Sequence, residues 1–209
     1  TIEGIAEAGS TVELFNGDAS LGTTTADGTT GIFSITPSSE LSEGLNSLTV
    51  TATDAINNVS AASSALSITV DTTAPTQPAI TTTTTLTSDA TPTIEGTAEA
   101  GSTVTLFVDG VTTGITTTAD GTTGIFSLTP LIALEEGLNS LTVTATDAQG
   151  NTSSASSALS ITVDTTAPAQ PSITTTTSLT NDSTPAIEGV AEAGSTVTLF
   201  VDGETTGIT

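Results

Sequence analysis

The chain of 209 residues contains no lysine, arginine, histidine, cysteine, methionine, tryptophan or tyrosine, and its aromatic content is five phenylalanines. Without cysteine and histidine, a disulfide, a thiol nucleophile, an imidazole base and a zinc site of the usual type are all excluded. Paired carboxylates remain as a catalytic option, but no aromatic platform for stacking a sugar accompanies them. We therefore expect that the protein is not an enzyme.

Positive charge is missing altogether, so the 23 carboxylates give a formal net charge of −23. Compensation has to come from bound cations or from solvent, because the chain can form no ion pair between side chains. This charge also argues against nucleic acid and anionic membrane surfaces as partners, since both require basic groups that face phosphate. Long apolar runs are missing too. The longest aliphatic run, residues 131–134, is far below the ~20 residues of a membrane span, so we expect no membrane insertion.

What the chain does contain is internal repetition. The phrase VDTTAP occupies residues 70–75 and returns 93 positions later at residues 163–168. Further phrases, among them AEAGSTV, TTTADGTTGIFS and EGLNSLTVTATDA, recur with nearly the same period. If each unit begins at the aspartate of DTTAP, residues 71–163 form one complete unit. Residues 1–70 are then a unit without its first strand, and residues 164–209 are the first half of a third.

Each unit alternates apolar and polar residues with a period of two, which indicates half-buried strands, and Asp-Gly pairs at residues 109–110 and 120–121 mark turns. About seven short strands in one unit predict an all-β fold, an antiparallel β-sandwich of the immunoglobulin type. We expect its core to depend on aliphatic residues and on Phe107 and Phe126. The expected strands lie near residues 79–83, 93–98, 103–108, 114–118, 124–129, 140–146 and 158–163.

Immunoglobulin strand order gathers acidic side chains at the two ends of each unit. The upstream pole, where the linker arrives, collects Asp71, Glu99, Asp120, Asp147 and Asn151. The outgoing Asp164 lies at the downstream pole, which meets the upstream pole of the next unit when units stack end to end. Because Ca²⁺ takes about six to eight oxygen ligands and tolerates irregular geometry, we predict Ca²⁺, in preference to Mg²⁺, at each junction.

The candidate ligands differ in rank. Asp71, Glu99 and Asp147 come first and Asp120 and Asn151 second, while Asp164, Glu192 and Asp54 occupy corresponding places in other units. The alternative is that loop carboxylates of this kind are ordinary solvated turn residues. We favour that alternative for Asp89, Asp109 and Glu135.

The combination of DTTAP, GTAEAGSTV and TATDAQGN resembles the bacterial Ig-like repeats of giant secreted adhesins, unit by unit over essentially the whole chain. The resemblance implies export to the extracellular space or the bacterial cell surface, in a long extender that Ca²⁺ stiffens at the repeat junctions. It implies the linker aspartates Asp71 and Asp164, together with Asp147, as calcium ligands. The first unit departs from the pattern, because TDAINNVS replaces TDAQGNTS around Asp54.

Two other functions remain open at this point. The incomplete units expose sheet edges, which favour strand exchange or lateral packing, so a self-assembling extracellular filament or sheath is the second hypothesis. A module that binds a glycan or another protein is the third, although the aromatic and arginine anchors of such surfaces are nearly absent. The expected partners are therefore neighbouring repeats of the same chain and, in a filament, other copies of it.

Overall fold

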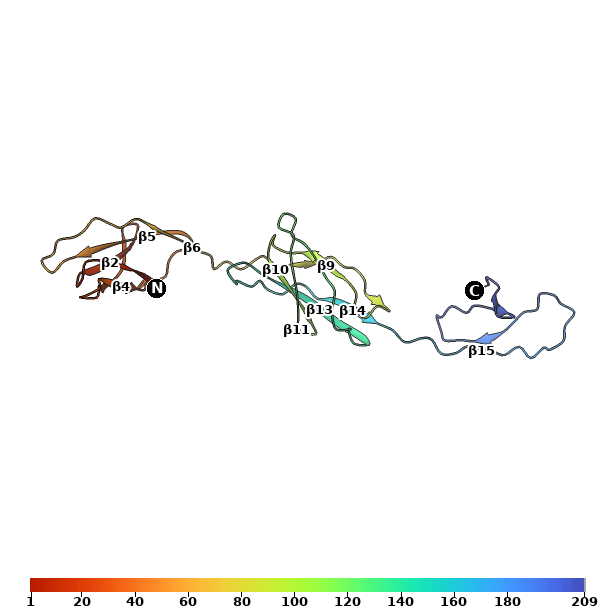
Figure 1. The fold of residues 1–209 in the computed structure, drawn as a ribbon. Helices are drawn as coiled ribbons and strands as arrows, with labels where there is room; N and C mark the ends of the chain where they lie inside the picture. The colour runs from red at the N-terminus through yellow and green to blue at the C-terminus, as the bar shows by residue number, and fades with distance from the viewer. Residues whose placement is uncertain (209) are drawn as a thin grey trace.

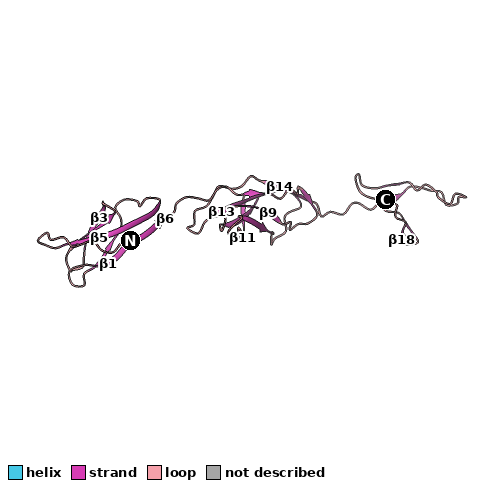
Figure 2. Cartoon of the chain, turned by 90° about the horizontal axis from the view of Figure 1, so that it is seen from above, coloured by secondary structure: helices cyan, strands magenta, loops and turns pink. Residues whose placement is uncertain are grey.

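The computed structural model describes residues 1–208, and all the regular elements in this part of the chain are β-strands. Figure 1 shows three bodies that follow one another along a line, and Figure 2 shows the same succession from above. No helix in the described part of the chain is long and apolar enough to cross a membrane. The predicted all-β fold class is confirmed.

Residues 79–163, within the predicted second unit (residues 71–163), fold into a sandwich of two sheets. Its strands are β7 (Ala79–Ile80), β8 (Leu86–Thr87), β9 (Ile94–Thr97), β10 (Thr103–Val108), β11 (Val111–Thr118), β12 (Ile125–Leu128), β13 (Gly137–Thr146) and β14 (Leu159–Val163). One sheet has the order β11-β10-β13-β14-β8 and the other the order β12-β9-β7. Buried aliphatic residues from both sheets form one core between them.

Three details of the predicted strands are corrected by the structure. Strands β11 and β13 begin at Val111 and Gly137, earlier than expected, because their pairing continues to the adjoining turns. Strand β8 was not predicted, since two residues are too few to show an alternation, and it pairs in parallel with β14. Residues 81–83, expected as the second part of the strand at 79–83, form no strand, and residues 81–85 connect β7 to β8 across the two sheets.

Of the two phenylalanines predicted to lie in the core, Phe126 is confirmed and Phe107 is wrong. Phe126 is buried, with 2% of its surface exposed, but Phe107 is only half-buried. Successive side chains of a strand point to opposite faces, so Phe107 lies on the outer face of β10 with Thr103 and Thr105. The ring of Phe126 packs over Gly96 of β9, where a Cβ atom would clash with it.

The first unit repeats this architecture without its first two strands. Its elements are β1 (Ile2–Ile5), β2 (Thr11–Asn16), β3 (Ala19–Thr25), β4 (Ile32–Ile35), β5 (Gly44–Thr53) and β6 (Leu66–Val70). The sheets have the orders β3-β2-β5-β6 and β1-β4. The positions that β7 and β8 cover in the second unit are uncovered here, and Ile68 is only half-buried where its counterpart Ile161 is fully buried.

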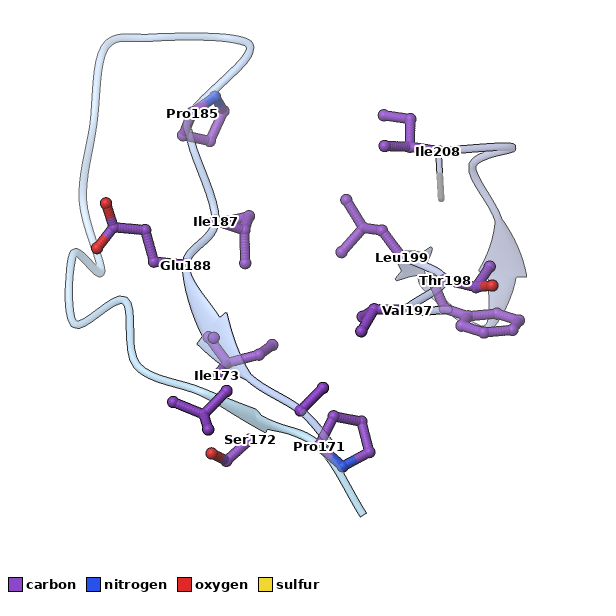
Figure 3. Close-up of a pocket in the computed structure, with 14 residues that line it drawn as sticks. Pro171, Ser172, Ile173, Pro185, Ile187, Glu188, Val197, Thr198, Leu199 and Ile208 are labelled. Carbon is purple, nitrogen blue, oxygen red and sulfur yellow. The ribbon is translucent and has the colours of Figure 1, made fainter. Parts of the chain in front are cut away.

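The third unit contains two small hairpin-like pairs. Strands β15 (Ser172–Ile173) and β16 (Gly189–Val190) pair with each other, as do β17 (Phe200–Val201) and β18 (Glu204–Thr205). An open apolar hollow of about 670 Å³ lies between the pairs. Figure 3 shows Ile187, Val197 and Leu199 among the side chains that line it. The counterparts of these three side chains are fully buried in the second unit. The hollow is therefore the uncovered inner face of half a sandwich.

Candidate functional site at the unit junction

The strand register of the second unit gathers the predicted residues at its two ends. Thr103, the first residue of β10, pairs with both Thr118 and Thr146, the last residues of β11 and β13. The loops that follow those strands carry Asp120 and Asp147, which therefore lie at the same pole. At the opposite pole, Gly137 pairs with Val163, so Glu136 and Asp164 are brought together.

The loop between β13 and β14 is organised around the carboxylate of Asp147. Its Oδ1 accepts hydrogen bonds from the backbone N–H groups of Gln149 (2.9 Å) and Asn151 (2.8 Å), and its Oδ2 accepts one from Nδ2 of Asn151 (2.8 Å). Burial by itself raises the pKa of Asp147, but the hydrogen bonds from Asn151 and from the loop backbone outweigh it and lower the pKa overall. Both oxygens of this carboxylate therefore have partners inside its own loop.

The same asparagine connects the second unit to the linker. Nδ2 of Asn151 also donates a hydrogen bond of 3.0 Å to the main-chain carbonyl oxygen of Asp71. Asp71, Asp147 and Asn151 therefore lie together at the upstream pole, as predicted, but Asp71 takes part through its main-chain carbonyl. Its side chain accepts a hydrogen bond from the backbone N–H of Thr73 instead.

The corresponding loop of the first unit keeps this geometry in spite of its different composition. Asp54 accepts hydrogen bonds from the backbone N–H of Ile56 (3.0 Å) and from the backbone and side-chain N–H groups of Asn58 (both 2.8 Å). The side chain of Asn58 is the main cause of the lowered pKa of Asp54. Asn57 adopts a φ of 67°, which takes the place of the left-handed Gly150 with φ of 93°. Asparagine tolerates this conformation better than most residues.

A glutamate outside the predicted set holds the linker from the side of the first unit. Oε2 of Glu43 accepts hydrogen bonds from the hydroxyl (2.7 Å) and the backbone N–H (3.1 Å) of Thr72, and its Oε1 accepts one from the hydroxyl of Thr73 (3.3 Å). The hydroxyl of Thr72 is the main cause of the lowered pKa of Glu43, and a small contribution comes from the carboxyl of Asp71. Glu43 therefore holds the two linker residues that directly follow Asp71.

The second junction repeats these contacts. Glu136 accepts hydrogen bonds from the hydroxyl (2.7 Å) and the backbone N–H (3.2 Å) of Thr165 and from the hydroxyl of Thr166 (3.4 Å). The carboxylate of Asp164 accepts the backbone N–H of Thr166 at 3.1 Å. Sequence reasoning missed Glu43 and Glu136 as linker contacts, although their recurrence in the phrase EGLN was a signal that pointed to them.

A buried asparagine fixes the position of each of these glutamates. Asn139 is 1% exposed and donates hydrogen bonds from Nδ2 to the carbonyl oxygens of Glu135 (2.8 Å) and Gly137 (3.0 Å), the two neighbours of Glu136. In the first unit Asn46 makes the equivalent bonds to Ser42 (2.7 Å) and Gly44 (3.0 Å). The asparagine of EGLN thus ties the glutamate that contacts the linker to the core of its own unit.

Three other predicted residues have separate surroundings. Oδ1 of Asp120 accepts the backbone N–H groups of Thr122 (3.0 Å) and Thr123 (2.7 Å) within its own turn. These bonds, that of Thr123 first, lower the pKa of Asp120. Glu99 is exposed, and its carbonyl accepts from Ser102. Glu192 accepts the backbone N–H of Ala169 at 3.0 Å, just beyond the second DTTAP.

Taken together, the carboxylates at the junctions accept hydrogen bonds mainly from linker threonines and from loop backbone. Within residues 1–208, no three Asp, Glu, His or Cys side chains lie close enough together to form a metal site by themselves. The structure therefore brings the main chain of Asp71 to Asn151, and it does not join the side chains of Asp71, Glu99 and Asp147 into one cluster. The calcium ligands stay a prediction.

Two facing sheets in this strand order, repeated along the chain, define a tandem immunoglobulin-like β-sandwich. The family model of the bacterial Ig-like domain matches residues 1–72 and 76–165. The chain belongs to this family, which confirms the resemblance seen in its repeated phrases. No curated protein is similar to the chain in sequence.

Several solved structures are similar to the chain. One, described as a Ca²⁺-stabilized adhesin that helps an Antarctic bacterium reach out and bind ice, is 27% identical over 82% of this chain and 45% of its own, with a TM-score of 0.47. An immunoglobulin-like domain of the M. primoryensis ice-binding adhesin is 28% identical over 44% of this chain and 100% of its own, with a TM-score of 0.30. The BSP domain of a biofilm associated protein is 25% identical over 77% of this chain and 26% of its own, with a TM-score of 0.35. The chain thus spans less than half the length of the first of these proteins.

Proposed function

We propose that this chain is a section of a structural extender, a non-catalytic rod of tandem Ig-like units with boundaries at residues 71 and 164, in a bacterial cell-surface adhesin or extracellular fibre. Membership of the bacterial Ig-like family and the succession of units along a line support this proposal. In such a rod each unit contacts its neighbours in the chain, and the function of the rod is to keep the segments at its two ends far apart.

The observation that carries the proposal is the position of Asp71. Its carbonyl oxygen is bound by Asn151 of the second unit, and the two residues that follow it, Thr72 and Thr73, are bound by Glu43 of the first unit. A flexible connector between independent domains has few such contacts, because its residues are mainly solvated. The linker instead forms part of the surface of both units, as a rod requires.

Calcium at the junction is the finer part of the proposal. Asp71 and Glu43 both lie at the first junction, and the chain has no basic side chain to compensate their negative charges. Oxygen donors are what Ca²⁺ prefers, and a site with few carboxylates completes its shell with carbonyl groups and water. We propose Asp71 and Asp164 as the central ligands of successive junctions. Glu43 and Glu136, Asp147 and the exposed Glu99 are the side chains available around them.

Small-angle X-ray scattering of the 209-residue chain tests the extender and the calcium separately. An elongated particle, whose maximum dimension matches three units in line, is expected in calcium, and a compact particle would contradict the extender. If calcium stiffens the rod, addition of EDTA broadens the distribution of distances within the particle and shortens its maximum dimension. An unchanged distribution would leave the rod intact and contradict its stiffening by calcium. The variant Asp71→Asn should reduce the EDTA effect, whereas Asp89→Asn, which changes the charge equally, should not.

A further inference from the structure

We infer that the first junction is held by a two-sided hydrogen-bond clamp that acts without a metal ion and sets the relative orientation of the first and second units. Glu43 of the first unit binds Thr72 and Thr73, and Asn151 of the second unit binds the carbonyl of Asp71. Three consecutive linker residues are therefore attached to two different units. The inference rests on the proposed extender function and gives the first junction a source of stiffness other than calcium.

Each half of the clamp is anchored in its own unit. Asn151 receives its orientation from Asp147, which accepts both its backbone N–H and its side-chain N–H at 2.8 Å. Glu43 lies between Ser42 and Gly44, whose carbonyl oxygens are bound by the buried side chain of Asn46. A rotation of one unit against the other would have to break a clamp contact, because neither side chain is free to follow.

The donors and acceptors explain why threonine follows the linker aspartate. Thr72 offers Glu43 both its backbone N–H and its hydroxyl, and Thr73 adds a second hydroxyl while its N–H binds the carboxylate of Asp71 at 3.1 Å. Hydrogen bonds to an ionised carboxylate are stronger than those between neutral groups. Pro75 then restricts the backbone just beyond the clamp.

The half-clamp at the second junction indicates that this is a repeated device. Glu136 holds Thr165 and Thr166 in the same way as Glu43 holds its two threonines. The requirements for the complete device are the glutamate of EGLN in one unit, DTT in the linker and the Asp-x-x-x-Asn loop of the next unit. These are positioning residues of the junction, and the phrase VDTTAP contains the part that both neighbours share.

The absence of cysteine from the chain makes a direct test possible. Thr23→Cys and Thr116→Cys place a spin label at corresponding exposed positions of β3 and β11, one in each unit. Pulsed electron paramagnetic resonance in the presence of EDTA then measures the distribution of distances between the two spin labels, one on each unit. The clamp predicts a narrow distribution without calcium. A distribution as broad as that of freely jointed units would overturn the inference.

Variants separate the clamp from a general loss of structure. Asn151→Ala is expected to broaden the distribution in EDTA, as are Glu43→Gln and Thr72→Val. The matched control is Asn58→Ala, which removes the same hydrogen bond to the loop aspartate, in this case Asp54. It should cost the first unit a similar loss of thermal stability and leave the distance distribution narrow. Equal distributions in Asn151→Ala and Asn58→Ala would contradict the clamp.

The same samples distinguish this inference from the calcium proposal. If the parent distribution is broad in EDTA and narrows when Ca²⁺ is added, the calcium-stiffened extender stands and the clamp fails. If it is narrow in both conditions and broadens in Asn151→Ala, the clamp stands and stiffening by calcium fails at this junction.

Discussion

Asn139 and Glu135 bind each other reciprocally: the side-chain amide of Asn139 donates to the carbonyl of Glu135 at 2.8 Å, and its Oδ1 accepts the backbone N–H of Glu135 at 3.2 Å. The asparagine is buried while Glu136, the next residue, is exposed and holds the linker. A core side chain thus determines the conformation of a surface loop that has a role at the junction.

The first prediction concerns this pair. Asn139→Ala leaves the part-buried carbonyl and N–H groups of Glu135 and Gly137 without their side-chain partner, so we expect a loss of about 1–3 kcal/mol in the free energy of unfolding. Urea unfolding of the 209-residue chain, followed by circular dichroism, measures it. Leu138→Ala, at a neighbouring side chain that is 72% exposed, is the control and should stay within about 0.5 kcal/mol of the parent. Equal effects of the two would show that the asparagine bonds contribute little.

The second prediction concerns the two phenylalanines. Phe126→Ala removes a side chain that is 2% exposed, and truncations of this kind cost about 3–5 kcal/mol. Phe107→Ala should cost clearly less, because that ring is half-buried on the outer face of β10. Thermal unfolding of the two variants compares their losses of stability. A larger loss for Phe107→Ala than for Phe126→Ala would contradict the assignment of Phe107 to the outer face of β10.

The third prediction concerns Gly96. A Cβ atom there would clash with the carbonyl oxygen of Ala79 and with the ring of Phe126, so Gly96→Ala should cost about 1–3 kcal/mol by overpacking. Gly121→Ala is the matched control, since a Cβ atom at Gly121 meets no atom within 4 Å and its φ is not left-handed. Calorimetry should show a lower melting temperature for the first variant and an unchanged or higher one for the second.

The fourth prediction concerns pH. The hydrogen bonds that lower the pKa of Asp120 below its ordinary 3.8 stabilise the folded state when the carboxyl is ionised. This contribution is complete above pH 3.8 and is lost as the pH falls through the lower pKa of the folded state. The difference in melting temperature between the parent and Asp120→Asn should therefore be constant at neutral pH and shrink in acid.

Net charge complicates that experiment, because protonation also relieves the repulsion among the 23 carboxylates. Glu40→Gln removes one charge from an exposed loop residue and serves as the reference. A difference between Asp120→Asn and Glu40→Gln that does not change with pH would mean that the turn around Asp120 gains nothing from ionisation.

The fifth prediction concerns calcium. A ligand that binds only the folded state raises the free energy of unfolding by RT ln(1 + [L]/Kd), and the melting temperature rises as a consequence. Addition of Ca²⁺ should therefore raise the melting temperature of the parent more than that of Asp71→Asn. Equal shifts in the two would exclude Asp71 as a ligand, and Mg²⁺ at the same concentration controls for screening of the net charge.

Much of the fold was predictable because it depends on local patterns. The alternation in residues 103–108 and the Asp-Gly pair that follows predicted β10 and its turn, and Asp109 and Gly110 adopt the φ values of 51° and 79° that a tight hairpin requires. Phe107 was assigned to the core because it is large and apolar, although the same alternation places it outside. Strand β8 has two residues, and it exists because β14 offers it an edge.

For the candidate site, the sequence alone determined the composition, the repetition, the strand alternation and the ends of the unit at which acidic residues collect. Only the tertiary structure decided which groups meet there: Glu43 with Thr72 and Thr73, and Asn151 with the carbonyl of Asp71. The physical reason is that strand periodicity is a property of neighbours in the chain. A hydrogen bond between residues 80 positions apart depends instead on how a folded unit places its loop against the linker.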